Sequence, residues 1–127
     1  MIFGIGTDVV EIHRIEAALE RHGERFAQRV LCPSELAVFQ KRRLKAAYLA
    51  KRFAAKEAFT KALGTGIKSP ANWHGVWVRN ERSGRPVLEF SDALKKFIAA
   101  KGVTAAHLSL SDEKGIAFAT VILECAK

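Results

Sequence analysis

The amino-acid sequence predicts a single α+β domain over residues 1–127. Helical spacing of apolar residues fills most of the first half of the chain. The second half holds two pairs of strand-like segments, each pair joined by turn residues. No repeat, linker or low-complexity stretch divides the chain. Helices and antiparallel hairpins that are segregated along the sequence are typical of the α+β class.

The first half of the chain is expected to form one strand and four helices. Residues 2–12 are rich in β-branched side chains and predict the strand. Gly23 is a suitable end for the first helix, and the turn at residues 64–66 is a suitable end for a long Ala-rich helix, because glycine often follows a helix. The expected helices cover residues 12–22, 24–31, 33–39 and 46–63.

The second half of the chain is expected to form two hairpins with a helix between them. Ser91 is a good N-cap for that helix, and Gly102 follows its expected end. Polar residues and glycines mark the two turns. The expected strands cover residues 75–80, 86–90, 105–111 and 116–124, the turns residues 81–85 and 112–115, and the helix residues 92–101.

The composition excludes several classes of protein. Hydrophobic residues make up 49% of the chain and charged residues 27%, which is the usual mixture of globular proteins. Uncharged stretches fall short of the roughly 20 apolar residues of a membrane span, and the first ten residues lack the basic region of a secretory signal. Two cysteines make no disulfide framework. We therefore expect a cytoplasmic protein without a membrane partner.

The net charge gives the first indication of a partner. Twenty-one Lys and Arg residues against 13 Asp and Glu residues leave a charge of +8 at pH 7. Such a surface attracts nucleic acid, acidic proteins, phosphorylated ligands or anionic lipid. The charge alone does not choose among these partners.

Two charged residues interrupt a stripe of small side chains on the long helix. Glu57 and Lys61 fall in the same angular sector as Ala46, Ala50 and Ala54. One interpretation is a surface Glu–Lys pair at i,i+4 spacing, which stabilises a helix by only about 0.2–0.5 kcal/mol. The other is that the alanines let a ligand or a strand approach a functional Glu57.

Asp8 lies in the first strand, which otherwise has the composition of a buried segment. It could be a strand-end carboxylate that faces water, since an interior strand rarely keeps an unpaired charge. If Asp8 and Glu57 met in space, however, the two carboxylates would be the usual protein share of a Mg²⁺ site. Mg²⁺ keeps waters and takes its other oxygens from substrate phosphates.

Two segments of the chain match the signatures of one known family. Residues 4–12 have the sequence GIGTDVVEI, and residues 52–66 have the sequence RFAAKEAFTKALGTG. They resemble the N-terminal motif and the central signature of the holo-acyl-carrier-protein synthases, which are short members of the 4′-phosphopantetheinyl transferase superfamily. Order, spacing and total length also fit. The resemblance implies an antiparallel sheet packed on a long central helix, with sites at subunit interfaces.

The resemblance also implies an activity in fatty acid biosynthesis. The family transfers the 4′-phosphopantetheine arm of coenzyme A to a serine of apo-acyl carrier protein and releases adenosine 3′,5′-bisphosphate. By position, Asp8 and Glu57 would hold Mg²⁺ against the pyrophosphate, and Lys61 would stabilise charge on the departing group. Glu57 would take the serine proton directly or through a metal-bound water, and the sequence leaves both routes open.

Further residues match the cofactor-contacting elements of the family. In the turn at residues 64–66, free backbone N–H groups would suit phosphate oxygens. The turn of the first hairpin matches an element beside the adenine, and the next strand matches one that contributes across a subunit boundary. The matching positions are Arg52, Gly64, Thr65, Gly66, Ser83, Gly84, Arg85, Pro86, His107 and Ser109. Without the resemblance, His107 and Ser109 read equally well as the solvated face of a strand. Arg85 is often a lysine in the family, and the loop that contains Trp73 departs from its pattern.

A basic segment is the expected docking surface for the acidic carrier protein. Arg14, Arg21, Arg25 and Arg29 would share one sector if the helix continued past Gly23. Such a run can simply be a solvated face, but Phe26 among the arginines gives the composition of a binding surface. The resemblance further implies a homotrimer.

Two other functions are compatible with parts of the sequence. A nucleic-acid-binding module would explain the charge, but no zinc-finger spacing, ribonucleoprotein motif or basic-region-plus-heptad pattern is present. A non-catalytic sensor of coenzyme A would bind the ligand without modifying serine. The complete set of Asp8, Glu57 and Lys61 argues against the sensor, so we expect a transferase that binds no nucleic acid.

Overall fold

The computed structural model describes all 127 residues and contains five helices and five strands. In chain order these are β1 (Ile2–Glu11), α1 (Ile12–His22), α2 (Glu24–Val30), α3 (Pro33–Lys41), α4 (Lys45–Leu63), β2 (Val76–Asn80), β3 (Pro86–Phe90), α5 (Asp92–Ala100), β4 (Val103–Glu113) and β5 (Ile116–Cys125). None of the helices is long and apolar enough to cross a membrane. The α+β class predicted from the sequence is confirmed.

The strands form two antiparallel sheets. One sheet has the order β1-β5-β4, and the other is the β2–β3 hairpin. In the larger sheet Asp8 lies opposite Ala119 of β5, which in turn lies opposite Leu110 of β4. Residues in one such row point to the same face of the sheet, so the register decides which side chains of three distant segments lie together.

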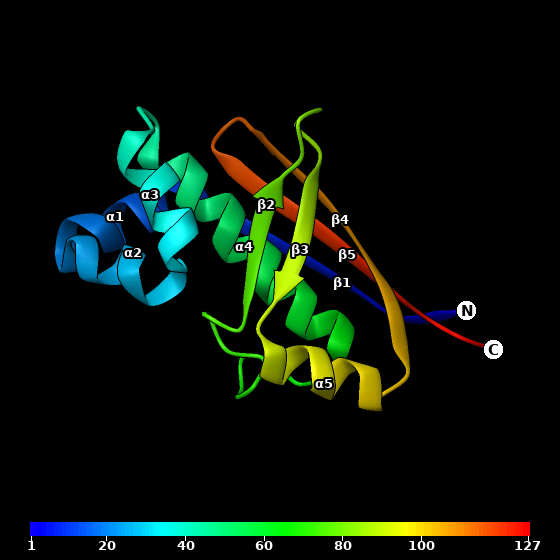
Figure 1. Cartoon of the computed structure of the whole chain (residues 1–127). Helices are drawn as coiled ribbons and strands as arrows, with labels where there is room; N and C mark the ends of the chain where they lie inside the picture. Colours follow the sequence, from blue (N-terminus) through cyan, green and yellow to red (C-terminus); the bar gives the residue numbers. More distant parts are fainter.

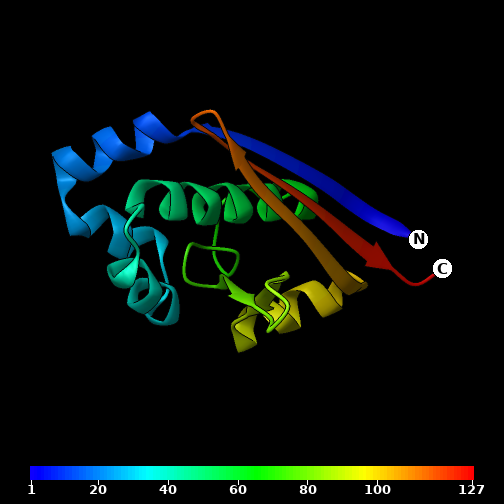
Figure 2. The same ribbon diagram turned by 90° about the horizontal axis from the view of Figure 1, so that it is seen from above.

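Helix α4 runs through the middle of the molecule. It lies between the β1-β5-β4 sheet and the β2–β3 hairpin, while α1, α2 and α3 gather near its N-terminal end (Figures 1 and 2). The two chain termini lie side by side, where the Met1 ammonium donates to the carbonyl of Cys125. Because α4 packs against the β1-β5-β4 sheet, residues of β1 that point inward lie against this helix.

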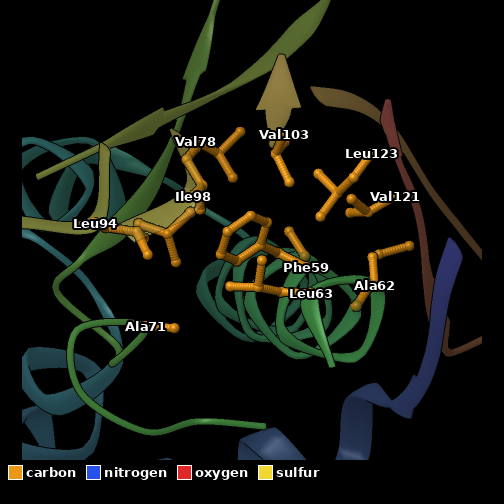
Figure 3. Close-up of a cluster of buried hydrophobic side chains, with 14 of the residues drawn as sticks. Phe59, Ala62, Leu63, Ala71, Val78, Leu94, Ile98, Val103, Val121 and Leu123 are labelled. Atoms are coloured by element: carbon orange, nitrogen blue, oxygen red, sulfur yellow. The ribbon is translucent and has the colours of Figure 1, made fainter. Parts of the chain in front are cut away.

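The core consists of two groups of buried side chains, and α4 contributes to both. Phe59 and Leu63 of α4 pack against the larger sheet, the hairpin and α5 (Figure 3). Leu49 and Ala50, nearer the N-terminus of α4, pack against α1, α2 and α3. Helix α4 is therefore buried on several sides along most of its length.

The structure confirms one predicted helix end and corrects one predicted turn. Gly23, with a positive φ of 64°, separates α1 from α2 as predicted. The last hairpin has longer strands than predicted, because Asp112 and Glu113 pair with β5 instead of forming the turn. Lys114 and Gly115 form the tight turn alone, with φ values of 52° and 81°, which is the backbone of a type I′ turn.

Candidate active site

Asp8, Lys61 and Glu57 converge where β1 crosses α4. The Lys61 ammonium lies 3.1 Å from Asp8 Oδ1 and donates at 3.0 Å to the carbonyl of Thr7. The Asp8 side chain is only 15% exposed, so it is not a strand-end carboxylate in water. The surface Glu57–Lys61 pair is not formed either, since Lys61 reaches across to the strand.

The electrostatics of this cluster favour a bound cation. Burial raises the pKa of Glu57 above its ordinary value, and the neighbouring Asp8 raises it further, while Lys61 opposes the shift. The second oxygen of Asp8, Oδ2, is buried and has no hydrogen-bond partner. Two carboxylates therefore face a single ammonium, and one carboxylate oxygen is left unsatisfied.

The donors at this point fit Mg²⁺. Both are hard carboxylate oxygens, and nowhere in the structure do three or more His, Cys, Asp or Glu side chains form a group that could enclose a metal. Mg²⁺ is commonly held by one or two carboxylates, with waters and substrate phosphates as its other ligands. The unpartnered Asp8 oxygen and the Glu57 carboxylate are therefore the groups that could hold such an ion.

Two glycines of β1 bring Asp8 onto the helix. A Cβ atom at Gly6 would lie 1.9 Å from the carbonyl oxygen of Ala58, and one at Gly4 would lie 2.0 Å from that of Ala62. Only glycine permits this approach of strand backbone to helix backbone. The alanines that admit the strand are Ala58 and Ala62, which continue along α4 the i,i+4 series of the predicted Ala46, Ala50 and Ala54, and the role of the two glycines was not predicted.

Arg52 lies close to the turn of the first hairpin, as its expected role requires. Its guanidinium is buried, stacks over the ring of Tyr48 and donates at 2.6 Å to Asn80 Oδ1, while its Nε has no partner. Burial lowers the pKa of Arg52 from its ordinary value. Asn80 in turn donates to the carbonyl of Gly84. The exposed turn that contains Ser83 and Arg85, with Pro86 at the start of β3, is thus connected to α4 through one amide side chain.

The turn after α4 uses its backbone N–H groups to cap the helix. The N–H groups of Gly64, Thr65 and Gly66 all donate to the carbonyl of Thr60. Contact of this turn with phosphate oxygens stays a prediction.

His107 and Ser109 lie on the outer face of the β1-β5-β4 sheet. Ser109 is in register with Thr120 of β5, which is in register with Thr7, and these residues point away from Asp8 and α4. His107 hydrogen-bonds Glu124 on the same face. Within one chain, neither residue joins the Asp8–Glu57 cluster.

The basic segment forms a surface pocket in spite of the helix break at Gly23. The pocket has a volume of about 480 Å³ and is lined by Arg21, His22, Arg25, Phe26 and Arg29. Arg14 is exposed on α1 but does not line it. The half-buried ring of Phe26 packs on Phe53, with ring centroids 6.4 Å apart, and Phe53 packs on Trp73 at 5.0 Å. Phe53 precedes Glu57 by one helical turn, so the Phe26–Phe53 contact joins the pocket to the part of α4 that carries Glu57.

The sequence analysis missed a buried ion pair between Lys56 and Glu35. The Lys56 ammonium is fully buried and lies 2.7 Å from Glu35 Oε1. A signal for it was present, because Lys56 lies seven residues from both Leu49 and Leu63, which are core residues of the same helix face. A charge at such a position requires a buried partner.

Comparisons with known proteins agree with these features. A family model described as the 4′-phosphopantetheinyl transferase superfamily matches residues 4–120. The holo-[acyl-carrier-protein] synthase of Vibrio parahaemolyticus is 53% identical over 123 residues, which cover 97% of this chain and 98% of that protein.

Solved structures of similar proteins have the same fold. The crystal structure of the holo-[acyl-carrier-protein] synthase from Neisseria meningitidis superposes with a TM-score of 0.95 at 41% identity, over 98% of this chain and 99% of that one. A holo-(acyl-carrier-protein) synthase from Bacillus anthracis in complex with CoA (3′,5′-ADP) gives a TM-score of 0.83 at 38% identity, over 99% of both chains.

Proposed function

Since the chain belongs to the 4′-phosphopantetheinyl transferase superfamily, as a holo-[acyl-carrier-protein] synthase, we propose that Asp8, Glu57 and Lys61 carry its reaction. The enzyme transfers the 4′-phosphopantetheine arm of coenzyme A to a serine of apo-acyl carrier protein. A bond forms between the serine oxygen and the phosphorus that bears the pantetheine arm. The bond from that phosphorus to the bridging oxygen of the pyrophosphate breaks, and adenosine 3′,5′-bisphosphate leaves.

The observation that carries this assignment is the unsatisfied charge of the cluster. Asp8 Oδ2 has no partner, and the pKa of Glu57 is raised beside it. We assign Asp8 and Glu57 as ligands of Mg²⁺, which when bound supplies positive charge at the pyrophosphate. Lys61, whose side chain is half-exposed, donates to the departing phosphate and stabilises its charge.

Glu57 has a second role as the acceptor of the serine proton. A carboxylate at the reacting centre can take the proton of an attacking hydroxyl. The partly buried setting between β1 and α4 also limits the access of water, which otherwise competes with serine for the phosphorus. The proton passes to Glu57 directly or through one water.

The coenzyme is proposed to extend from this cluster toward Arg52 and the first hairpin. Arg52 has an unpartnered Nε, and together with Ser83, Gly84, Arg85 and Pro86 it offers donors and a positive surface to phosphate and adenine groups. For Gly64, Thr65 and Gly66, contact with the coenzyme remains a proposal that no longer rests on free amides.

The acidic acyl carrier protein is proposed to dock on the pocket of Arg21, Arg25, Phe26 and Arg29. Three arginines around a half-buried aromatic ring suit an acidic helix with an apolar residue. Arg14 extends the same positive region along α1. The net charge of +8 would steer the acidic partner toward this surface.

Homotrimer formation is proposed because the outer face of the β1-β5-β4 sheet is unusually apolar. Ile5 is 58% exposed, Val9 54% and Phe118 41%. Covering this face with another copy would bury these side chains and bring His107 and Ser109 against a neighbouring chain, where they could complete its site. Phe118→Glu is expected to dissociate the oligomer, as measured by light scattering after size exclusion. An unchanged mass would refute this interface.

We further propose that the chain is one domain and that it is located in the cytoplasm. The 127 residues act as one domain, since α4 contributes to both core clusters. A cytoplasmic location fits the two free thiols of Cys32 and Cys125.

Mass spectrometry of apo-acyl carrier protein incubated with this protein, coenzyme A and Mg²⁺ tests the function. We expect the carrier to gain one phosphopantetheine, and EDTA to abolish the gain. Glu57→Gln, assayed in parallel, controls for a contaminating transferase. Coenzyme A binding without any modification of several carrier proteins would favour the sensor.

A further inference from the structure

The polar atoms of the buried pair on Lys56 and Glu35 are almost completely satisfied. The Lys56 ammonium donates to Glu35 Oε1 at 2.7 Å, to the carbonyl of Val30 at 2.6 Å and to the carbonyl of Trp73 at 2.8 Å. An ammonium has three donors, and all three are used. Cys32 Sγ also lies near this nitrogen, at a distance of 4.0 Å.

Glu35 extends the network to two more backbone groups. Its Oε1 also accepts from the N–H of Cys32 at 2.9 Å, and its Oε2 accepts from the N–H of Val78 at 2.9 Å. Two adjacent side chains thereby connect α4 to the end of α2, the start of α3, the loop before β2 and β2 itself. No other side-chain pair in the structure joins so many segments.

A buried ion pair of this kind is a poor explanation of stability. Removing two charges from water is costly, and replacing such a pair by apolar side chains of similar size is often neutral or stabilising. A pair with fixed directions does, however, hold the segments that it joins in one arrangement. Without the pair, those segments could shift relative to one another.

The segments held by this pair include the helix that carries the proposed docking pocket and the helix that carries Glu57. Helix α2 carries Arg25, Phe26 and Arg29 of the proposed docking pocket. Lys56 is the immediate neighbour of Glu57, and successive residues on a helix point about 100° apart. The contact of Lys56 with Val30 at the end of α2 is thus a direct tether between the docking helix and the helix that carries Glu57.

We propose that the Lys56–Glu35 pair is a positioning device that holds the carrier-protein docking helix α2 at a fixed place relative to Glu57. This inference rests on the proposed function, because it assumes that the carrier docks on α2 and that Glu57 acts on the carrier serine. Both side chains are buried, so the pair is proposed to act through the segments that it joins. Coenzyme A is proposed to lie toward Arg52 and the first hairpin, which the pair contacts through the N–H of Val78 and not through α2.

The double variant Lys56→Met/Glu35→Gln tests the tether without leaving a buried unpaired charge. We expect kcat/KM for apo-acyl carrier protein to fall about 10- to 100-fold, since displacements of about 1 Å at a distance can cost that much. The KM for coenzyme A should change much less than that for the carrier, because Glu35 reaches the first hairpin only through the N–H of Val78. Leu94→Ala is the control, because Leu94 is equally buried but lies on α5 in the other core cluster.

Hydrogen exchange of the free protein provides a readout that needs no substrate. In the double variant, the amides of α2 and α3 should exchange faster, while those of β1, β5 and β4 keep their protection. In Leu94→Ala these two helices should remain as in the wild type. If the wild type modified no carrier protein, the proposed function would fail, yet the exchange data would still report whether the pair holds α2 and α3.

Should the double variant fail to fold, Glu35→Asp serves in its place. The aspartate keeps the charge but is one methylene shorter, so it cannot reach Lys56, Cys32 and Val78 together. The same selective loss toward carrier protein is expected, with a smaller amplitude. Equal changes in both KM values, or a carrier KM and helix exchange like those of the wild type, would overturn the positioning role.

Discussion

Helix α4 carries two charged clusters on neighbouring residues, and they differ in how completely their polar atoms are paired. At Lys56 every donor of the ammonium has a partner, and the side chain is fully buried. At Glu57 two carboxylates face one ammonium, and Asp8 Oδ2 has no partner. The two clusters lie on different faces of the same helix.

This difference indicates a structural role for the Lys56 cluster and a chemical role for the Glu57 cluster. A buried polar group without a partner costs free energy, so a folded protein keeps one only where something else compensates for it. A closed network has no capacity for a ligand, whereas an open one does. The pKa of the Cys32 thiol, which is raised to about 11 mainly by burial, likewise indicates an unreactive group inside the closed cluster.

Removal of the Glu57 charge should have the largest effect on activity. Glu57→Gln is expected to lower the transfer rate by about 10²–10⁴-fold, the range lost when a general base is removed. The rate is measured by mass spectrometry of the carrier protein. Glu113→Gln, which changes an exposed glutamate near the last turn, should leave the rate unchanged. A Glu57→Gln rate close to that of the wild type would remove Glu57 from the mechanism.

Displacing β1 from α4 should disrupt the open cluster through its geometry. Gly6→Ala places a Cβ atom 1.9 Å from the Ala58 carbonyl, and such overpacking typically costs about 1–3 kcal/mol of stability. The strand must shift, and Asp8 two residues away shifts with it, so activity should fall by about 10²-fold. Gly4→Ala creates a similar overlap farther from Asp8. Comparable denaturation midpoints but a smaller loss of activity are expected for Gly4→Ala, and equal activity losses would contradict this explanation.

Reversal of one charge in the docking pocket should affect only the carrier protein. Arg25→Glu is expected to raise the carrier KM by about tenfold at low salt, because electrostatic steering is lost. The difference from the wild type should shrink as salt screens the charges. Lys96→Glu on α5 makes the same change of net charge at a distance and should have little effect. Arg14→Glu, outside the pocket, should lie between the two. A parallel rise in the coenzyme A KM would argue against a docking surface.

The smallest expected effect is on the stability of the metal-free protein. The raised native pKa of Glu57 means that the native state holds this proton more tightly than the unfolded chain does. Its contribution to stability is therefore complete below the unfolded pKa and is lost as pH rises through the native pKa. At neutral pH without metal, Glu57→Gln should raise the melting temperature by a few degrees.

Addition of Mg²⁺ should make the wild type more stable than Glu57→Gln. Mg²⁺ is expected to raise the melting temperature of the wild type, since it binds the native state only. It should have a weaker effect on Asp8→Asn and none on Glu57→Gln. Equal responses of the three proteins, measured by thermal unfolding with and without EDTA, would place the metal elsewhere.

Local sequence patterns are sufficient to predict the order and type of the elements and the candidates for chemistry on α4. Ala-rich spacing, the glycine turn after residue 63 and the polar turns of the two hairpins act over a few residues, so their structures follow from local patterns. The family signatures likewise lie within continuous segments, at residues 4–12 and 52–66.

Only the tertiary structure decided which of these residues meet. Asp8 reaches Lys61 because Gly4 and Gly6 let β1 lie against α4, and the strand register turns Ser109 to the opposite face of the sheet. Lys56 finds Glu35 from 21 residues away. Such pairings depend on the close packing of segments that are distant in the chain. They therefore cannot be predicted from patterns within a few neighbouring residues.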